Sequence, residues 1–389
     1  MNTIVVVFII AAILALVASL FCGHLLARYG FPVPDNQPRI GHIDGLRGYL
    51  ALLVAISHFV MWTRLVGWGI PWGKTPATLN TIGQGPVAIF FMITGLLFYP
   101  KVRGGFGKVS WPSLIISRLF RIYPAALLAI ALIVVSLWRN AGYPVDSSTL
   151  IDTARNLVFW TLFISEPPLF GITDSELANA GVFWTLRAEW IFYLGVLPLF
   201  SILRSLAPSN LSQSFSPILM IPLYGLFKVL APGFAGFITH FMLGMIAFEI
   251  CENPRLASFF RKDIVATFGL LIMIAAAILL PTPTTGRTVI FYFPFFICVA
   301  CGHSYFGALS NKGALVLGEA SYGIYVLHGF VLWVIANGAK PLIVANPVLW
   351  AAALPPVLAL IALLSAAIYL GIEAPMIRKG RQIGRQMRR

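Results

Sequence analysis

Long apolar segments recur along nearly the whole of this 389-residue chain, and they constrain its fold more than any other feature. Each is close to the roughly 20 helical residues that cross the hydrocarbon core of a bilayer. With 59% hydrophobic and 10% charged residues, the composition is typical of an integral membrane protein. Because a backbone in lipid must satisfy its hydrogen bonds internally, we expect an all-α, polytopic helical bundle.

Hydropathy predicts about eleven transmembrane helices in this bundle. The predicted spans cover residues 3–22, 46–66, 82–99, 123–138, 184–203, 215–231, 234–250, 264–280, 286–302, 316–336 and 347–372. Their alternation leaves most of the 27 Lys and Arg residues on one side, which the positive-inside rule identifies as cytoplasmic. The N-terminus is then expected outside, and the basic tail 376–389 in the cytoplasm.

The formal net charge of +14 does not indicate nucleic-acid binding, because the basic residues are dispersed between apolar segments. The four cysteines lie in or beside apolar segments, and the CxxC of Cys298 and Cys301 lacks the second pair of a zinc site. The sequence therefore predicts neither a disulfide framework nor a metal site. Lipid is the expected partner of the outer helix surfaces, and the membrane domain has to carry the function.

Two ionisable side chains share one face of the segment Ile43–Phe59, IDGLRGYLALLVAISHF. Arg47 and His58 are eleven residues apart, so at about 100° and 1.5 Å per residue they point the same way, roughly 16 Å apart. Taken singly, they read as an interfacial anchor and a packing histidine. The pair favours a function, because an ionisable group at helix depth is costly and tends to mark a site.

Two further ionisable side chains, Glu189 and His328, are predicted at a depth similar to that of His58. Glu189, in WTLRAEWIFYLGVLP, lies one to two turns inside the outer boundary, where a carboxylate needs a partner. In LGEASYGIYVLHGFVLW, Tyr325 and His328 share a face with Ser321. Alone, His328 reads as a packing residue, but its coincident depth favours a common site with His58 and Glu189.

Arg118 and Arg121 form a third feature, three residues apart beside the predicted cytoplasmic surface in WPSLIISRLFRIYPAALL. Arginine forks match the geometry of phosphate groups, so this pair is suited to a phosphorylated ligand. The competing interpretation is ordinary positive-inside anchoring.

IDGLRG with its Arg-x10-His spacing, WTLxxE and the Ser-Tyr…Tyr-Leu-x-His run resemble motifs of acyltransferase family 3. Members of that family are membrane proteins that move acyl groups from coenzyme A thioesters to extracytoplasmic carbohydrate or related acceptors. The resemblance covers residues 43–375, so residues 1–28 would be an extra N-terminal helix before a ten-helix acyltransferase core. Pro86 and Ala88 depart from the family pattern, which usually has a glycine and an acidic residue there.

The resemblance implies a membrane O-acyltransferase of the bacterial inner membrane, with a carbohydrate acceptor. Acyl-CoA would be the donor substrate, with acetyl as the expected acyl group and no bound cofactor. We expect His58 to act as general base on the acceptor hydroxyl or, equally compatible with the sequence, to attack the thioester itself. Glu189 would orient His58, and His328 or Tyr325 would stabilise the oxyanion.

The phosphates of coenzyme A would bind Arg47, Arg118 and Arg121. A rival hypothesis is a proton-coupled transporter or flippase of an anionic solute, with Arg47, His58 and Glu189 along its path. Such transporters often contain paired, interrupted spans in matching halves, and this sequence has no such internal symmetry. A structural scaffold would leave the three ionisable groups without a reason to be buried.

Overall fold

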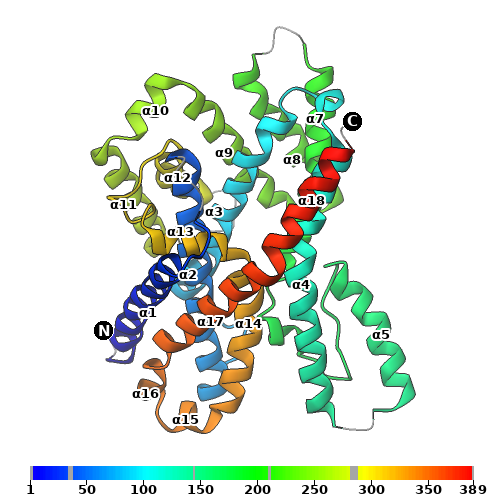
Figure 1. Cartoon of the computed structure of the whole chain (residues 1–389), viewed down its shortest axis with the longest axis vertical. Helices are drawn as coiled ribbons and strands as arrows, with labels where there is room; N and C mark the ends of the chain where they lie inside the picture. The colour runs from blue at the N-terminus through cyan, green and yellow to red at the C-terminus, as the bar shows by residue number, and fades with distance from the viewer. Residues whose placement is uncertain (1–2, 34–37, 143–144, 209–211, 281–287, 388–389) are drawn as a thin grey trace.

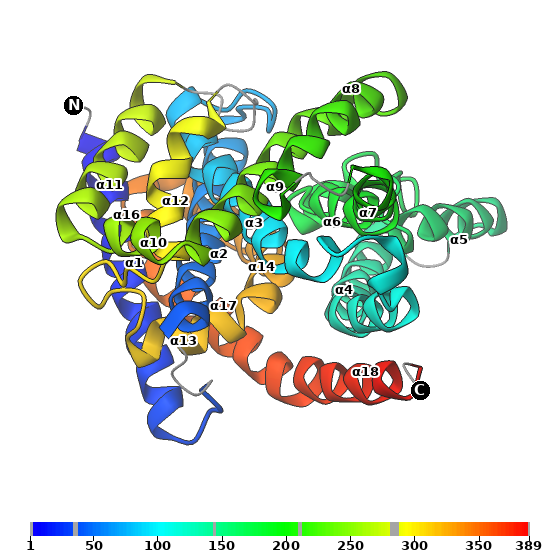
Figure 2. The ribbon, with the colours of Figure 1, turned by 90° about the horizontal axis from the view of Figure 1, so that it is seen from above.

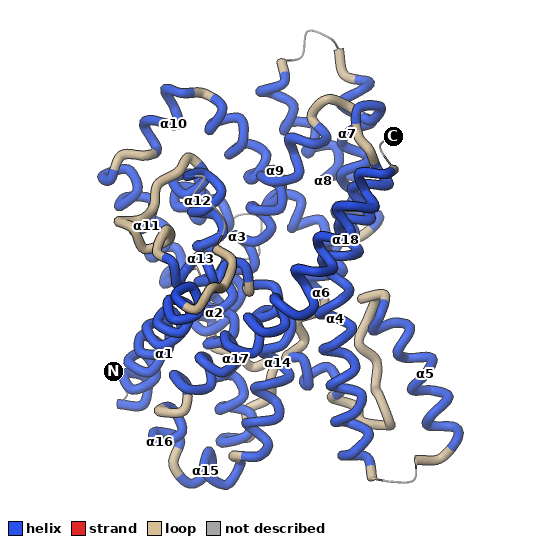
Figure 3. The backbone as a smooth tube through the Cα atoms, in the orientation of Figure 1, coloured by secondary structure: helices blue, strands red, loops and turns tan. Residues whose placement is uncertain are grey.

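The computed structural model describes residues 3–33, 38–142, 145–208, 212–280 and 288–387. Throughout these ranges the chain consists of helices joined by loops, with one isolated β-bridge between Leu169 and Ile172 (Figure 3). The helices are α1 Thr3–Arg28, α2 Pro38–Trp68, α3 Ala77–Val102, α4 Trp111–Ala141, α5 Ser147–Thr161, α6 Trp184–Ile191, α7 Leu197–Leu206, α8 Met220–Leu230, α9 Pro232–Glu252, α10 Pro254–Phe260, α11 Asp263–Leu279, α12 Phe293–Ala300, α13 Lys312–Glu319, α14 Ser321–Gly338, α15 Lys340–Ala345, α16 Pro347–Ala351, α17 Leu354–Ile368 and α18 Ala374–Gln386. The expected all-α membrane bundle is confirmed.

Eight helical segments within the described ranges are long and apolar enough to cross a membrane, or nine if the bent pair α10 and α11 forms one span. The expectation of about eleven spans is too high, although each predicted segment falls on a helix. The segments predicted at 215–231 and 286–302 correspond to Ser214–Leu230 and Val289–Ala300, which are shorter apolar helices of 10–17 residues. At about 1.5 Å per residue, such helices fall short of a hydrocarbon core of roughly 30 Å.

Two of the spans contain a π-helical turn, and in both a proline follows closely. The turn Phe192–Val196 joins α6 to α7 and precedes Pro198, whereas the turn Tyr369–Glu373 joins α17 to α18 and precedes Pro375. Proline removes a backbone donor and its ring collides with the carbonyl four residues earlier, so the helix widens locally. The first of these turns begins three residues after Glu189, at the end of α6.

The helices form two groups with the candidate site between them (Figures 1 and 2). In one group α2 packs against α3, α13 and α14, and α3 packs against α9. In the other, α4 lies along α18 and contacts α5. Contacts of α14 with both α2 and α4 connect the groups. Residues that line a space between the groups therefore come from distant parts of the sequence.

Helix α1 lies on the outside of the first group, against α13 and α17. Its opposite face exposes large apolar side chains, among them Ile13, Val17 and Phe21. A helix of this length and hydropathy with such a face is suited to contact with lipid.

Candidate active site

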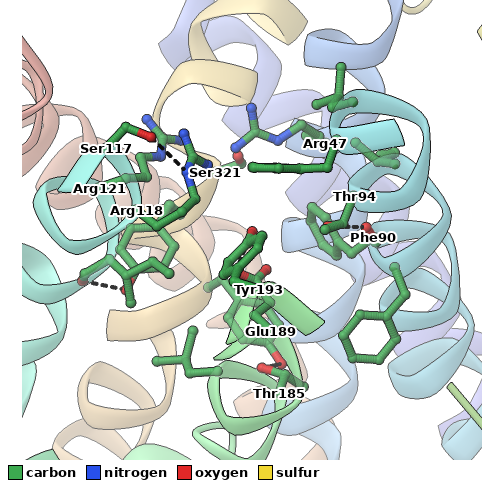
Figure 4. A pocket seen from close by; sticks show the side chains of 18 of the residues that line it. Arg47, Phe90, Thr94, Ser117, Arg118, Arg121, Thr185, Glu189, Tyr193 and Ser321 are labelled. Atoms are coloured by element: carbon green, nitrogen blue, oxygen red, sulfur yellow. Dashed lines mark hydrogen bonds between the residues drawn. The ribbon is translucent and has the colours of Figure 1, made fainter. Parts of the chain in front are cut away.

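A cavity of about 470 Å³ lies between the two groups, with walls contributed by α2, α3, α4, α6, α13, α14 and α18. Arg118 and Arg121 of α4 stand across from Arg47 of α2 (Figure 4). Glu189 and Thr185 of α6 lie beneath these guanidinium groups in the same view. The structure thus brings the three predicted phosphate-binding arginines and Glu189 to one cavity, although they span more than 140 residues of sequence.

The position of Arg47 follows from close packing of α2 on α13. A Cβ added to Gly318 would lie 2.0 Å from the Asp44 carbonyl oxygen, and one on Gly45 would lie 1.9 Å from that of Leu309. Only glycine permits this backbone approach. Arg47 then donates to Asp44 Oδ1 at 3.3 Å, and this carboxylate, 8% exposed, limits the directions that the guanidinium can take. The IDGLRG sequence therefore packs α2 closely and directs the Arg47 side chain into the cavity.

The two α4 arginines are positioned by aromatic rings. The Arg118 guanidinium carbon lies 4.9 Å from the centroid of Phe98, and that of Arg121 lies 5.9 Å from the centroid of Tyr322. Among the described residues, no carboxylate oxygen lies within 4 Å of the Arg118 or the Arg121 guanidinium group. Because their donors are not consumed by a protein anion, they remain available to an anionic ligand.

Glu189 takes a different partner from the one expected. Its Oε2 accepts a hydrogen bond from Tyr193 Oη at 3.2 Å, one helical turn further on, and Arg118 is the cation that attracts it most strongly. Helix α6 turns the carboxylate into the arginine-lined cavity, whereas His58 hydrogen-bonds to α14. The predicted contact between Glu189 and His58 is therefore not among the hydrogen bonds of the described residues.

His58 instead pairs with His328, 270 positions away in the sequence. His58 Nδ1 lies 2.8 Å from His328 Nε2, and the ring planes are within 4° of parallel. His328 Nδ1 lies 3.0 Å from the Ile324 carbonyl oxygen, which can only accept, so Nδ1 carries the proton. When both rings are neutral, His328 Nε2 must then accept from His58 Nδ1. This hydrogen-bond network leaves the lone pair of the dyad on His58 Nε2.

Tyr325 forms the wall between this histidine dyad, defined as His58 and His328, and the cavity. Its ring meets His328 edge-on at 5.9 Å and Phe90 at 6.1 Å, and both Tyr325 and Phe90 line the cavity. Its hydroxyl is hydrogen-bonded with Thr185 Oγ1 at 3.0 Å. His58 thus lies one side chain behind the cavity surface and not on it.

The other side of His58 is covered by the connection after α2. The Trp72 ring lies 5.6 Å from the His58 ring at an angle of 23°. His58 keeps part of its surface accessible, whereas His328 is fully buried. Of the dyad, His58 is therefore the ring that a second substrate can approach.

Sequence reasoning missed four residues of this region: Thr185, Tyr193, Trp72 and Arg381. Thr185 and Tyr193 stand four residues on either side of Glu189, so the helical period identifies them as its neighbours. Arg381 belongs to the segment predicted as a basic tail, and its place in the cavity wall depends on tertiary packing. For Trp72, in a loop, the sequence carries no periodic signal.

Comparison with known proteins identifies the family of the chain. A family model described as an acyltransferase domain matches residues 40–369. Nodulation protein 10 of Rhizobium leguminosarum bv. viciae is 30% identical over 188 residues, which are 44% of this chain and 48% of that protein, so the alignment spans about half of the curated relative. None of the solved structures gives a significant match. Because the family model covers most of the chain, this multi-pass membrane protein belongs to acyltransferase family 3.

Proposed function

We propose that the protein is an O-acyltransferase that moves an acyl group, with acetyl as the expected group, from acyl-CoA to a hydroxyl of an extracytoplasmic carbohydrate. The observation that carries the proposal is the position of a phosphate-compatible cavity on one side of Tyr325 and a polarised histidine dyad on the other. Acyl transfer from a nucleotide thioester needs both parts, an anion site and a base.

The donor would bind through its phosphates to Arg47, Arg118 and Arg121, with the thioester reaching past the Tyr325 ring toward His58. Arginine suits this role because its planar donors match phosphate oxygens in pairs. Glu189 would act as a positioning residue that holds Tyr193 and balances the charge of Arg118.

The acceptor hydroxyl would approach His58 from the side of Trp72. His58 Nε2 removes the hydroxyl proton as the oxygen attacks the thioester carbonyl, and the proton passes to the departing coenzyme A sulfur, which yields an ester and free thiol. His328, held by Ile324, keeps His58 in the required tautomer, as the third member of a catalytic triad does. Tyr325 then remains as the donor to the oxyanion.

A route in which His58 Nε2 attacks first, giving an acyl-histidine, uses the same atoms. Rapid quench with labelled acetyl-CoA in the absence of acceptor separates the two routes, since only the covalent route leaves label on the protein.

The charge distribution supports a cytoplasmic opening for the arginine-lined cavity and an outside N-terminus, in a bacterial inner membrane. Residues 1–28 would be an added helix and 43–375 the catalytic core. Labelling of single introduced cysteines with a membrane-impermeant maleimide in intact cells checks this orientation.

The direct test of the proposal is acetyl transfer or thioester hydrolysis by purified protein in detergent, since an enzyme needs no sealed compartment. We expect free coenzyme A to be released in proportion to protein. A preparation that binds acetyl-CoA yet never releases thiol, with any glycan extract, would contradict the proposal.

A further inference from the structure

Helix α18 forms part of the cavity wall, although it lies beyond residue 369, where the match to the family model ends. It runs along α4 (Figure 2) and contributes Ile377 and Arg381 to the cavity lined by Arg118 and Arg121. The segment expected to be a basic tail, 376–389, is therefore largely a packed helix.

Two glycines determine how α18 meets α4. A Cβ on Gly380 would lie 2.6 Å from Phe120 Cβ, and one on Gly384 would lie 2.8 Å from Ser113 Oγ. Their spacing of four residues puts both on one face and lets the helix axes approach closely. This contact holds the adjacent, basic face of α18 at the opening of the cavity.

The basic face carries Arg378, Arg381 and Arg385, all exposed and spaced three and four residues apart. These arginines, with Gln382 and Gln386, line an open surface pocket on α18 that shares Arg381 with the cavity. Among the described residues no carboxylate lies within 4 Å of the three guanidinium groups. The face is thus a row of uncompensated positive charge leading out from Arg118 and Arg121.

A coenzyme A thioester has anionic groups at two positions: the pyrophosphate in the middle and the 3′-phosphate at the adenosine end, farthest from the thioester. With the thioester near Tyr325 and the pyrophosphate at Arg47, Arg118 and Arg121, the adenosine end lies at the opening. The exposed Arg381 is the guanidinium that joins these two regions.

We propose that α18 is a donor-specificity element in which Arg381 and Arg385 bind the 3′-phosphate of acyl-CoA. The proposal rests on the proposed function, because it assumes a nucleotide thioester in the cavity. The same phosphate chemistry is offered by anionic lipid headgroups, so the experiment has to separate the two sources.

The test compares acetyl-CoA with acetyl-3′-dephospho-CoA as donors for the full-length protein in nanodiscs of zwitterionic lipid. The wild type is expected to favour acetyl-CoA in kcat/KM by about tenfold or more, the range for charge-assisted hydrogen bonds. In Arg381→Gln/Arg385→Gln the ratio of the two kcat/KM values is expected to fall toward one, through KM. Lys379→Gln is the matched control, since Lys379 is an exposed cation of α18 that lines neither the cavity nor the surface pocket.

A wild type that uses both donors equally, or a variant that retains the full ratio, would overturn the assignment while leaving the proposed function in place. A defect equal for both donors that appears only in nanodiscs with anionic lipid would assign the arginines to lipid and likewise overturn it. If the wild type transfers from neither donor, the proposed function fails. In that case, calorimetry tests the assignment: the ratio of the dissociation constants for coenzyme A and 3′-dephospho-coenzyme A is compared between the wild type and the variant.

Discussion

The arginine-lined cavity and the histidine dyad lie on opposite sides of Tyr325, and they satisfy their polar groups in opposite ways. In the cavity, Arg118 and Arg121 face open space, held by aromatic rings and without a carboxylate within 4 Å among the described residues. In the dyad, each histidine completes the other, and the Ile324 carbonyl ends the chain of hydrogen bonds. The cavity is suited to being completed by a ligand, whereas the dyad is preorganised without one.

The difference predicts that removal of the base abolishes chemistry without removing the donor site. In His58→Ala we expect turnover to fall by about 10²- to 10⁴-fold, the usual contribution of a general base, with acyl-CoA affinity retained. His240→Ala is the control, since His240 is a buried histidine that bonds Gly236 and lies outside the cavity lining. Undiminished transfer by the His58 variant in detergent would refute its assigned role.

Loss of the cavity arginines should give the complementary result. For Arg118→Gln/Arg121→Gln we expect the donor KM to rise roughly 10- to 100-fold, because each charge-assisted contact contributes about 1.5–3 kcal/mol in isolation and these are partly redundant. The kcat value should change far less. Arg139→Gln, at the exposed opposite end of the same helix, should match the wild type in both parameters. A loss confined to kcat would mean that these arginines act in chemistry and not in donor binding.

A smaller effect is expected at His328, which would act on the reaction only through His58. In His328→Asn the dyad loses its fixed tautomer, and we expect kcat to fall about tenfold, with little effect on donor KM. Combined with His58→Ala it should add nothing further, since residues that act as a unit are non-additive. The measurement is a double-mutant cycle on kcat. If the decrease in kcat in the double variant equalled the product of the two single decreases, the two histidines would act separately.

The last prediction concerns stability, not activity, on the side of the dyad. Gly329, next to His328, seats the turn Ser175–Asn179, since a Cβ there would lie 2.2 Å from the Asn179 carbonyl group. Near this turn, in the loop between spans, burial and, to a smaller extent, the charge of Glu176 raise the pKa of Glu166 to about 7.

Between about pH 4.3, the unperturbed value, and pH 7, folded Glu166 keeps a proton that the unfolded chain has lost. Its contribution is therefore fully present at lower pH and is lost as pH rises through 7. We expect Glu166→Gln to raise thermal stability above pH 7 by up to about 3 kcal/mol, and to have no effect below pH 4. Asp152→Asn, an exposed carboxylate on α5, is the control. A stability gain independent of pH would contradict the titration.

The number of membrane spans could not be predicted from local sequence alone. Hydropathy located every apolar helix, but the proline-interrupted and short segments, such as Ser214–Leu230, depend on how the chain packs around them. The spacing of Arg47 and His58 predicts one shared face of α2, but in the structure Arg47 lines the cavity whereas His58 pairs with His328 behind Tyr325. The ligand-facing role of Arg381 had no counterpart in the sequence, since a basic segment looks alike whether it is a free tail or a packed helix.

The sequence by itself determined that this chain is a membrane helical bundle with ionisable groups in its spans, because apolar length and backbone hydrogen bonding are local properties. It also identified the side chains that carry the candidate chemistry. Only the tertiary structure decided their partners: His328 for His58, and Tyr193 with Arg118 for Glu189. Helical periodicity specifies the face on which a side chain lies, but the neighbouring helix on that face is selected by close packing between segments hundreds of residues apart.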